Sequence, residues 1–171
     1  YDTRIYRSLK DDGNSLPDSY IEDIQEDATG NLWVRTGAGY AIYNSVSDIF
    51  DRNVEGWMWH IGISGNPSTV YIDSEKIFWI YVAGKGIYCY KPGQENAVMV
   101  AGTDTLLTEM NITDMTECSE GILLAFGNGV LACLDREKLN VKWTFDGIAS
   151  QWGKNQSETF TLFVDSHERV W

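Results

Sequence analysis

The sequence has few basic residues, only two histidines and no long apolar run. Lysine and arginine together number 13 against 25 aspartates and glutamates, so the formal net charge is −12. A negatively charged surface repels nucleic-acid phosphates and anionic lipids, and neither is expected as a partner. No apolar stretch reaches the roughly 18 residues of a membrane-spanning helix, so no membrane insertion is expected of this segment.

The cysteines and histidines are too few and too scattered for a zinc site. Cys89, Cys118 and Cys133 form no Cys-x-x-Cys pair, and only His60 and His167 could complete a ligand set. We therefore expect no metal and no cofactor. All three cysteines have apolar neighbours, which is typical of small buried residues. An oxidising compartment would leave room for one disulfide.

Helical periodicity is almost absent, and the sequence contains a repeat instead. DATGNLW (27–33), DSEKIFW (73–79) and DSHERVW (165–171) each place an aspartate six residues before a tryptophan. A degenerate copy, CSEGILL (118–124), has cysteine at the aspartate position and leucine at the tryptophan position. The copies end at 33, 79, 124 and 171, with spacings of 46, 45 and 47 residues. Such a period indicates one structural unit repeated along the chain.

The flanks of each copy repeat as well. A Gly-x-Gly follows at 37–39, 84–86 and 127–129, and apolar runs lie on both sides. Runs rich in aromatic and β-branched residues are typical of strands, while Asp and Gly favour hairpin turns. Each unit therefore reads as four strands. The best helical candidate, SDIFDRNVEGWMW, is interrupted by Gly56.

A four-stranded unit of this length that is apolar on both faces is typical of a β-propeller blade. Solenoids are the rival architecture, but β-helix turns are shorter and helical repeats need a 3.6-residue period. We predict an all-β fold, a β-propeller fragment of about three to four four-stranded antiparallel blades. Residues 1–171 would form a single partial propeller. Its blade units are placed near 16–60, 61–106 and 107–153, with partial units at 1–15 and 154–171.

Residues present in every unit are expected to serve the fold. A phosphate-binding glycine loop would need a following helix, whereas a strand follows here. A catalytic aspartate would not be copied into each blade. The tryptophans and Leu124 are expected to be buried at equivalent blade positions. The structural repeat residues are Asp27, Gly30, Trp33, Gly39, Asp73, Trp79, Gly86, Leu124, Gly129, Asp165 and Trp171.

The first unit resembles a known repeat. LPDSYIEDIQEDATGNLWVRTGAGYAIYN (16–44) is similar to the two-component regulator propeller repeat, with its Leu-Pro, its strand ending in Asp, its Gly-Asn-Leu-Trp and its glycine-rich turn. The second copy lacks the Gly-Asn, and the third lacks both Asp and Trp. The resemblance is therefore specific in the first unit and looser afterwards.

The resemblance implies a sensory role. Such repeats build the periplasmic sensor of hybrid two-component systems in gut Bacteroidetes, which detect oligosaccharides and regulate glycan utilisation. The parent would be an inner-membrane histidine kinase, and this segment would be non-catalytic. GVLACLDREKLNVKWTF (129–145) instead looks like a quinoprotein-type repeat. A quinoprotein-like or scaffold propeller serving protein–protein interaction is therefore the alternative.

Residues outside the repeat are the better candidates for ligand binding. Trp57 and Trp59 alternate, which in a strand would place both on one face. Indole rings can stack on sugars, although packing between blades is the favoured interpretation of these two. Arg35 and Tyr81 each follow a repeat tryptophan by two positions. The candidate oligosaccharide contacts are Trp57, Trp59, His60, Arg35, Tyr81 and Trp152.

The sequence contains no Gly-x-Ser-x-Gly, no His-Glu-x-x-His and no nucleotide loop, so no catalytic residue is predicted. Propellers close with about 4–8 blades, and this chain holds fewer than four units. It begins in what looks like an outer strand, YDTRIYRSL. An open arc would leave apolar blade faces bare, so self-association through these faces is expected.

Overall fold

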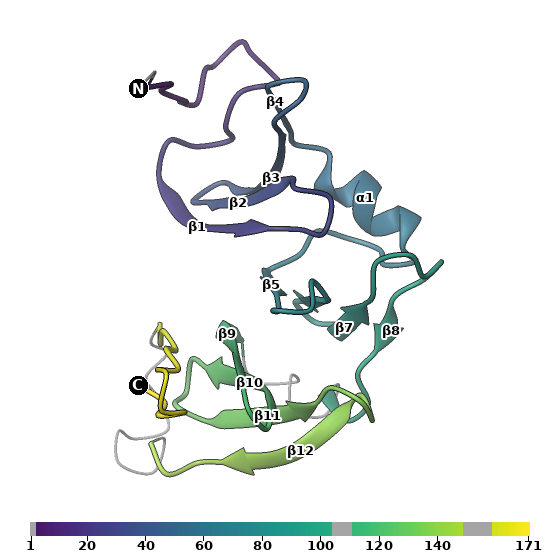
Figure 1. Ribbon diagram of the computed structural model, residues 1–171, viewed down its shortest axis with the longest axis vertical. Helices are drawn as coiled ribbons and strands as arrows, with labels where there is room; N and C mark the ends of the chain where they lie inside the picture. Colours follow the sequence, from purple (N-terminus) through teal and green to yellow (C-terminus); the bar gives the residue numbers. More distant parts are fainter. Residues whose placement is uncertain (1–2, 104–110, 149–158) are drawn as a thin grey trace. The chain divides into compact units, whose positions relative to one another are not determined.

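The computed structural model describes residues 3–103, 111–148 and 159–171. The chain divides into two compact units, Tyr1–Asn66 and Pro67–Trp171. The first unit contains one four-stranded antiparallel sheet and the second contains two (Figure 1). In each sheet, strands that are consecutive in sequence are neighbours. The fold is therefore an all-β propeller fragment built of four-stranded blades, as the repeat predicts.

The strands of each sheet follow the repeat along the chain. The first sheet consists of β1 (Ile21–Glu26), β2 (Leu32–Thr36), β3 (Gly39–Asn44) and β4 (Ile49–Asp51). The second consists of β5 (Thr69–Ile72), β6 (Phe78–Val82), β7 (Gly86–Tyr90) and β8 (Val98–Met99). The third consists of β9 (Ile112–Cys118), β10 (Gly121–Phe126), β11 (Leu131–Asp135) and β12 (Asn140–Phe145). The quinoprotein-like passage 129–145 thus forms the outer hairpin of the third sheet.

The first sheet is covered on one face by the segment that precedes it. Leu16 packs with Val34, Ala41 and Phe50 in one buried cluster. Arg52 fixes this segment, because its guanidinium donates to three backbone carbonyls, those of residues 12, 15 and 16, at 2.7–3.1 Å. Residues 3–9 lie outside any strand, so the predicted outer strand there is wrong. Their hydrogen bonds run through side chains and the Leu9 carbonyl, not through a strand ladder.

A short helix, α1 (Val54–His60), follows the first sheet, where no helix was predicted. The Asn53 side chain caps its first turn by accepting a hydrogen bond from the Gly56 amide. Val54 and Met58 are buried four residues apart, as on one helical face. Gly56 is therefore tolerated inside the helix, since the cap and the buried face offset its low helix propensity.

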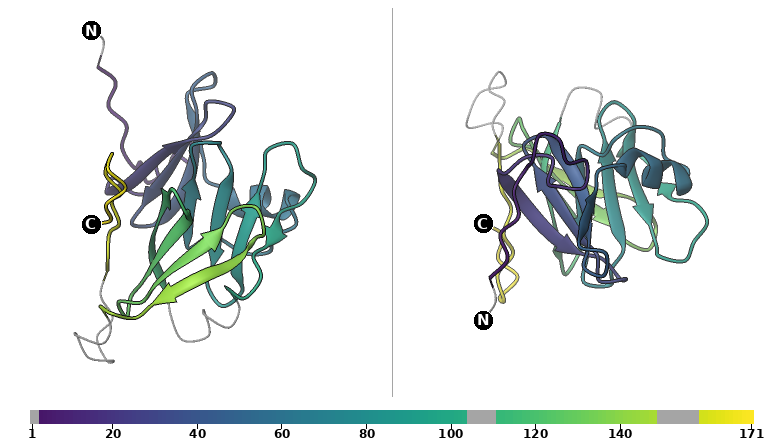
Figure 2. Two further views of the ribbon diagram at one scale, coloured as in Figure 1. Left: turned by 60° about the horizontal axis from the view of Figure 1, so that its bottom comes forward. Right: turned by 90° about the horizontal axis from the view of Figure 1, so that it is seen from above.

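The two sheets of the second unit pack face to face (Figure 2). Trp79, Tyr81 and Ile87 of the second sheet share one buried cluster with Leu124 and Phe126 of the third. The inner strands β5 and β9 also contact each other. The main chain continues this contact at the outer edge, where the Ala101 amide donates to the Leu139 carbonyl at 2.8 Å.

This packing corrects one expectation. Trp79 lies on the face of the second sheet that meets the third, whereas Leu124 lies on the face of the third sheet that meets the second. The two are buried but do not occupy equivalent positions. The reason is the preceding turn, which spans 73–77 in the second sheet but only 119–120 in the third. A loop shorter by an odd number of residues moves the aligned position to the other face of the sheet.

Candidate functional site

Three of the four repeated turns have the same construction. In each, the aspartate amide donates to the carbonyl four residues later, at 3.0 Å. The aspartate Oδ1 accepts from the amides two and four residues later, at 2.8–3.1 Å. The aspartate Oδ2 accepts from the indole of the repeat tryptophan, at 3.0–3.3 Å. The turns that share this pattern begin at Asp27, Asp73 and Asp165.

The repeated glycines also lie in turns or at strand ends. Gly30, Gly39, Gly86 and Gly129 all have positive φ. At the position of Gly30 the other two aspartate turns place Lys76 and Glu168, with φ of 64° and 60°. These aspartates and glycines therefore shape hairpins, and their contacts are those of turn residues.

The third turn is the exception, and a hollow lies beside it. With cysteine in place of aspartate, the hairpin closes through the pair Cys118–Gly121 around Ser119 and Glu120. A cavity of about 430 Å³ opens at this end of the second unit. It is lined by Tyr71, Thr116, Glu117, Cys118, Ser119, Arg136, Val164, Asp165 and Glu168. We take this hollow as the candidate functional site.

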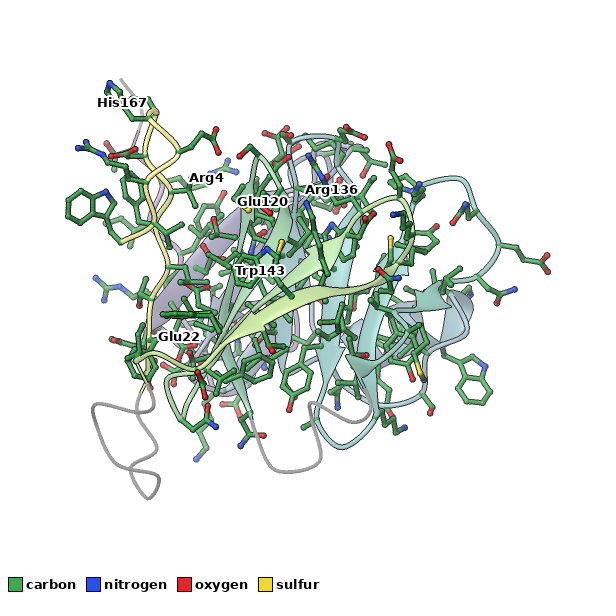
Figure 3. The ribbon with its side chains drawn as sticks, turned by 90° about the horizontal axis from the view of Figure 1, so that it is seen from below. Arg4, Glu22, Glu120, Arg136, Trp143 and His167 are labelled. Atoms are coloured by element: carbon green, nitrogen blue, oxygen red, sulfur yellow. The ribbon has the colours of Figure 1, made fainter. Side chains whose placement is uncertain are left out.

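Glu117 organises the wall of the hollow. Its carboxylate accepts hydrogen bonds from the Ser74 amide and hydroxyl, both at 2.9 Å, and pairs with the Arg136 guanidinium. Its backbone amide donates to the Tyr71 hydroxyl at 3.0 Å. Strand β9 is thereby tied to the second sheet at the mouth of the hollow. Figure 3 shows Arg136 and Glu120 at the same end of the third sheet.

The opposite wall comes from the fourth repeated turn, which begins at Asp165. The Ser119 amide donates to Glu168 Oε2 at 2.9 Å, which joins the shortened turn to the segment 163–171. That segment closes its own hairpin through paired backbone hydrogen bonds between Phe163 and Trp171. The hollow is thus bounded by the second sheet, the third sheet and the hairpin of residues 163–171.

Neighbouring groups set the protonation states of Glu117 and Tyr71 at the hollow. Desolvation acts to raise the pKa of Glu117, but the hydrogen bonds from Ser74 and the charge of Arg136 outweigh it and hold the pKa below its usual value. Burial raises the pKa of the Tyr71 hydroxyl. Glu117 is therefore ionised and Tyr71 neutral at pH 7.

The structure separates the candidate sugar contacts Trp57 and Trp59. Both lie in α1 and not in a strand, so they do not share the face that a strand would give them. The favoured interpretation that both rings pack between blades is wrong for Trp59, whose side chain is exposed. The Trp57 ring packs edge-on against Trp33, with centroids 4.6 Å apart. Trp59 is 72% exposed. Within the first unit, Trp57 therefore belongs to the packing, while Trp59 is available to a ligand.

The other candidates are dispersed. His60 is exposed at the end of α1, and Arg35 pairs with Glu22 at 2.8 Å in the first sheet. Tyr81 is buried between the second and third sheets, and its hydroxyl donates to Asn111 at 3.2 Å. Trp152 lies outside the described residues. None of the described candidates lines the hollow.

Sequence reasoning missed Glu117, Ser119, Arg136 and Glu168. One signal was present: the third copy departs from the repeat at 118–124, where the aspartate and tryptophan are lost. Within the described ranges, no group of three or more His, Cys, Asp or Glu is arranged to hold a metal ion. In those same ranges no helix has the length and apolarity needed to cross a membrane.

Comparison with known proteins identifies the first repeat. Residues 15–38 match the family described as "Two component regulator propeller". These residues run from the segment before β1 to the end of the β2–β3 turn. No curated protein matches the chain in sequence.

Solved structures of similar fold come from B. thetaiotaomicron. The extracellular domain of BT4673, described as a putative one component system and elsewhere as a putative hybrid two component system, gives a TM-score of 0.58 at 20% identity. The match covers 91% of this chain and 19% of that domain. The extracellular domain of the putative hybrid two component system BT3049 gives 0.59 at 14% identity, over 98% of this chain and 21% of that domain.

The solved structures support the fold of almost the whole chain, whereas the family match concerns residues 15–38. The chain spans about one fifth of the length of the solved domains, and the low identities establish the fold they share. The family match is confined to the segment in which the sequence follows the repeat most closely. The chain is thus a fragment of a β-propeller whose first blade carries a two component regulator propeller repeat.

Proposed function

We propose that this chain is part of the extracytoplasmic sensor propeller of a hybrid two-component system, and that the sensor detects an oligosaccharide. The observation that supports it best is the match of residues 15–38 to the two component regulator propeller family. The fold similarity to extracellular domains of putative two component systems points in the same direction. In this proposal the segment is periplasmic and non-catalytic, and the parent is a histidine kinase that regulates glycan utilisation.

The test is direct binding. The chain is titrated with a panel of neutral and acidic oligosaccharides by isothermal calorimetry. We expect at least one neutral oligosaccharide to bind without being hydrolysed, as judged by chromatography of the sugar afterwards. Absence of binding across the panel, or turnover of a sugar, would contradict the proposal.

Variants then locate the contacts. Trp59→Ala and His60→Ala remove exposed groups of α1, and Arg35→Ala removes a guanidinium of the first sheet. Tyr20→Ala is the aromatic control, because Tyr20 is an exposed ring of the first unit that is not a candidate contact. Binding that falls with Trp59→Ala and His60→Ala would place the ligand on α1. Binding unchanged by these variants would remove this helix and Arg35 from the site.

A further inference from the structure

The hollow lies beside the turn at which the repeat is broken. In the second sheet five residues, 73–77, connect β5 to β6, and the aspartate binds its own turn. In the third sheet only residues 119–120 connect β9 to β10. The volume of the hollow lies within the roughly 300–1,000 Å³ of small-ligand pockets. The hollow beside the break is therefore of the right size for a ligand.

Several polar groups at the hollow are left over after the internal hydrogen bonds are made. Among the described residues, the structure gives no partner to the Ser119 hydroxyl, to Glu168 Oε1 or to the Arg136 Nη2 group. They provide a donor and acceptor, an acceptor, and a donor respectively. Thr116 and Tyr71 add two hydroxyls. Val164 is the single aliphatic side chain of the lining.

We propose that this hollow is a binding site for a small, neutral, hydroxyl-rich ligand, one or two sugar rings in size. The proposal rests on the proposed sensor function and assigns its ligand a place and a chemical class. Hydroxyl groups both donate and accept, so they match a lining that mixes a guanidinium, carboxylates and hydroxyls. The charge excludes anions: Glu117, Asp165 and Glu168 stand against Arg136 alone, in a chain of net charge −12.

The carboxylates do not make the hollow a cation site. Both oxygens of Asp165 accept hydrogen bonds within its own turn, and Glu117 is neutralised by Arg136. Glu168 is the one carboxylate with an oxygen left over. Directed hydrogen bonds to hydroxyls therefore satisfy the lining better than a positive charge.

Cys118 offers a direct readout, because it lines the hollow and is partly exposed. Cys89 and Cys133 are internal controls, because both are buried. Burial raises the pKa of Cys89 to about 11, and burial together with the neighbouring Cys118 thiol raises the pKa of Cys133 to about 12. Iodoacetamide should modify Cys118 first, because it is the partly exposed thiol of the three. The rate at Cys118 is followed by peptide mass spectrometry, with and without saturating neutral disaccharides built from hexoses. We expect the sugar to slow modification of Cys118 alone.

Two variants test the lining. Arg136→Gln removes the guanidinium. It should lower the affinity for the protecting sugar by about tenfold or more, because a charged hydrogen bond is lost. Arg4→Gln is the matched control, since Arg4 is also paired with a carboxylate, that of Asp48, but lies in the first unit. Ser119→Ala removes a hydroxyl that has no structural partner among the described residues, so it should weaken protection without disturbing folding.

The outcomes separate this proposal from the proposed function. Protection by neutral sugars that falls with Arg136→Gln and Ser119→Ala, and not with Arg4→Gln, supports both. Calorimetric binding without protection of Cys118 overturns the hollow as the site and leaves the sensor proposal standing. Protection only by a uronic-acid disaccharide overturns the ligand class. If the chain neither binds a sugar in the calorimeter nor shows protection of Cys118, both proposals are overturned.

Discussion

The Trp79 indole donates a hydrogen bond of 3.0 Å to the carboxylate of Asp73, and both side chains are buried. One oxygen of Asp73 closes the turn and the other anchors the tryptophan that packs against the next sheet. The six-residue spacing in the sequence is therefore a physical link between a turn and an inter-sheet core. Trp33 and Trp171 make the same contact with Asp27 and Asp165.

Asp73→Ala should destabilise the second unit by about 3 kcal/mol, because two amides and an indole lose their acceptor in a buried site. Asp27→Ala should cost about 1 kcal/mol, since Asp27 is only half-buried and water can replace it. Urea unfolding followed by tryptophan fluorescence measures both. Equal losses in the two variants would show that burial of the turn does not set the strength of this link.

Gly121→Ala should be among the most destabilising single changes in the third sheet. A Cβ there would lie 1.9 Å from the Leu134 carbonyl oxygen, and φ is 149°. We expect a loss of about 3 kcal/mol or more. Gly39→Ala is the control: its φ is 115° but nothing lies within 4 Å, so about 1–2 kcal/mol of backbone strain remains. Thermal unfolding of the two variants gives the comparison, and similar melting temperatures would contradict the steric explanation.

The fold class could be predicted from the sequence because the same pattern of strands and turns occurs several times along the chain. Every unit signals its strands by two-sided apolar runs and its turns by Asp or Gly, so one degenerate copy does not hide the period. Helix α1 was missed because Gly56 counts against a helix, while the cap by Asn53 and the burial of Met58 act only in the folded unit. The face of Leu124 was missed because alignment by sequence conceals a turn of different length.

The candidate site was less predictable for a similar reason. Glu117, Arg136 and Glu168 are ordinary surface residues in the sequence, and only the hairpin geometry brings them around one hollow. Aromatic residues attracted attention because indoles bind sugars, yet Trp57 and Tyr81 are used in packing. The shortened third turn was the informative feature, but its length is known only from the pairing of β9 with β10 in the folded sheet.

Trp57 and Trp59 should differ sharply in their effect on stability. Trp57→Ala removes a ring in contact with Trp33 and should destabilise the first unit by about 2–3 kcal/mol. Trp59→Ala should change stability by less than about 0.5 kcal/mol, because its side chain is exposed. Chemical denaturation monitored by circular dichroism distinguishes them. A large loss for Trp59→Ala would show that this side chain is packed in solution.

The Tyr43 hydroxyl should lose its proton at a higher pH than an ordinary tyrosine. Its hydroxyl bonds to Tyr6 at 2.8 Å and donates to Asp48 at 2.9 Å, and these contacts raise its pKa to about 12. The folded state then keeps a proton that the unfolded chain releases near pH 10. The stabilising contribution is complete below about pH 10 and is lost as the pH rises through about 12.

An NMR titration of the Tyr43 ring measures this pKa. Tyr6→Phe removes the largest contribution, so the pKa should fall toward its usual value. Tyr20→Phe is the control, because Tyr20 is 70% exposed and no contact to Tyr43 is described. An unaltered Tyr43 titration in Tyr6→Phe would exclude the hydrogen-bonded pair as the cause.

Self-association should involve the C-terminal hairpin. The first sheet is already covered on one face by Leu16, so that face offers little bare apolar surface. Phe163 and Trp171, by contrast, are 62% and 66% exposed and lie opposite each other on the two arms of one hairpin. Clustered apolar side chains seek partners, so we expect a concentration-dependent dimer by light scattering. Trp171→Ala should shift it toward monomer, whereas Trp59→Ala, which removes an equally exposed ring elsewhere, should not. A monomer at all concentrations, or equal effects of the two variants, would rule out this hairpin as the contact.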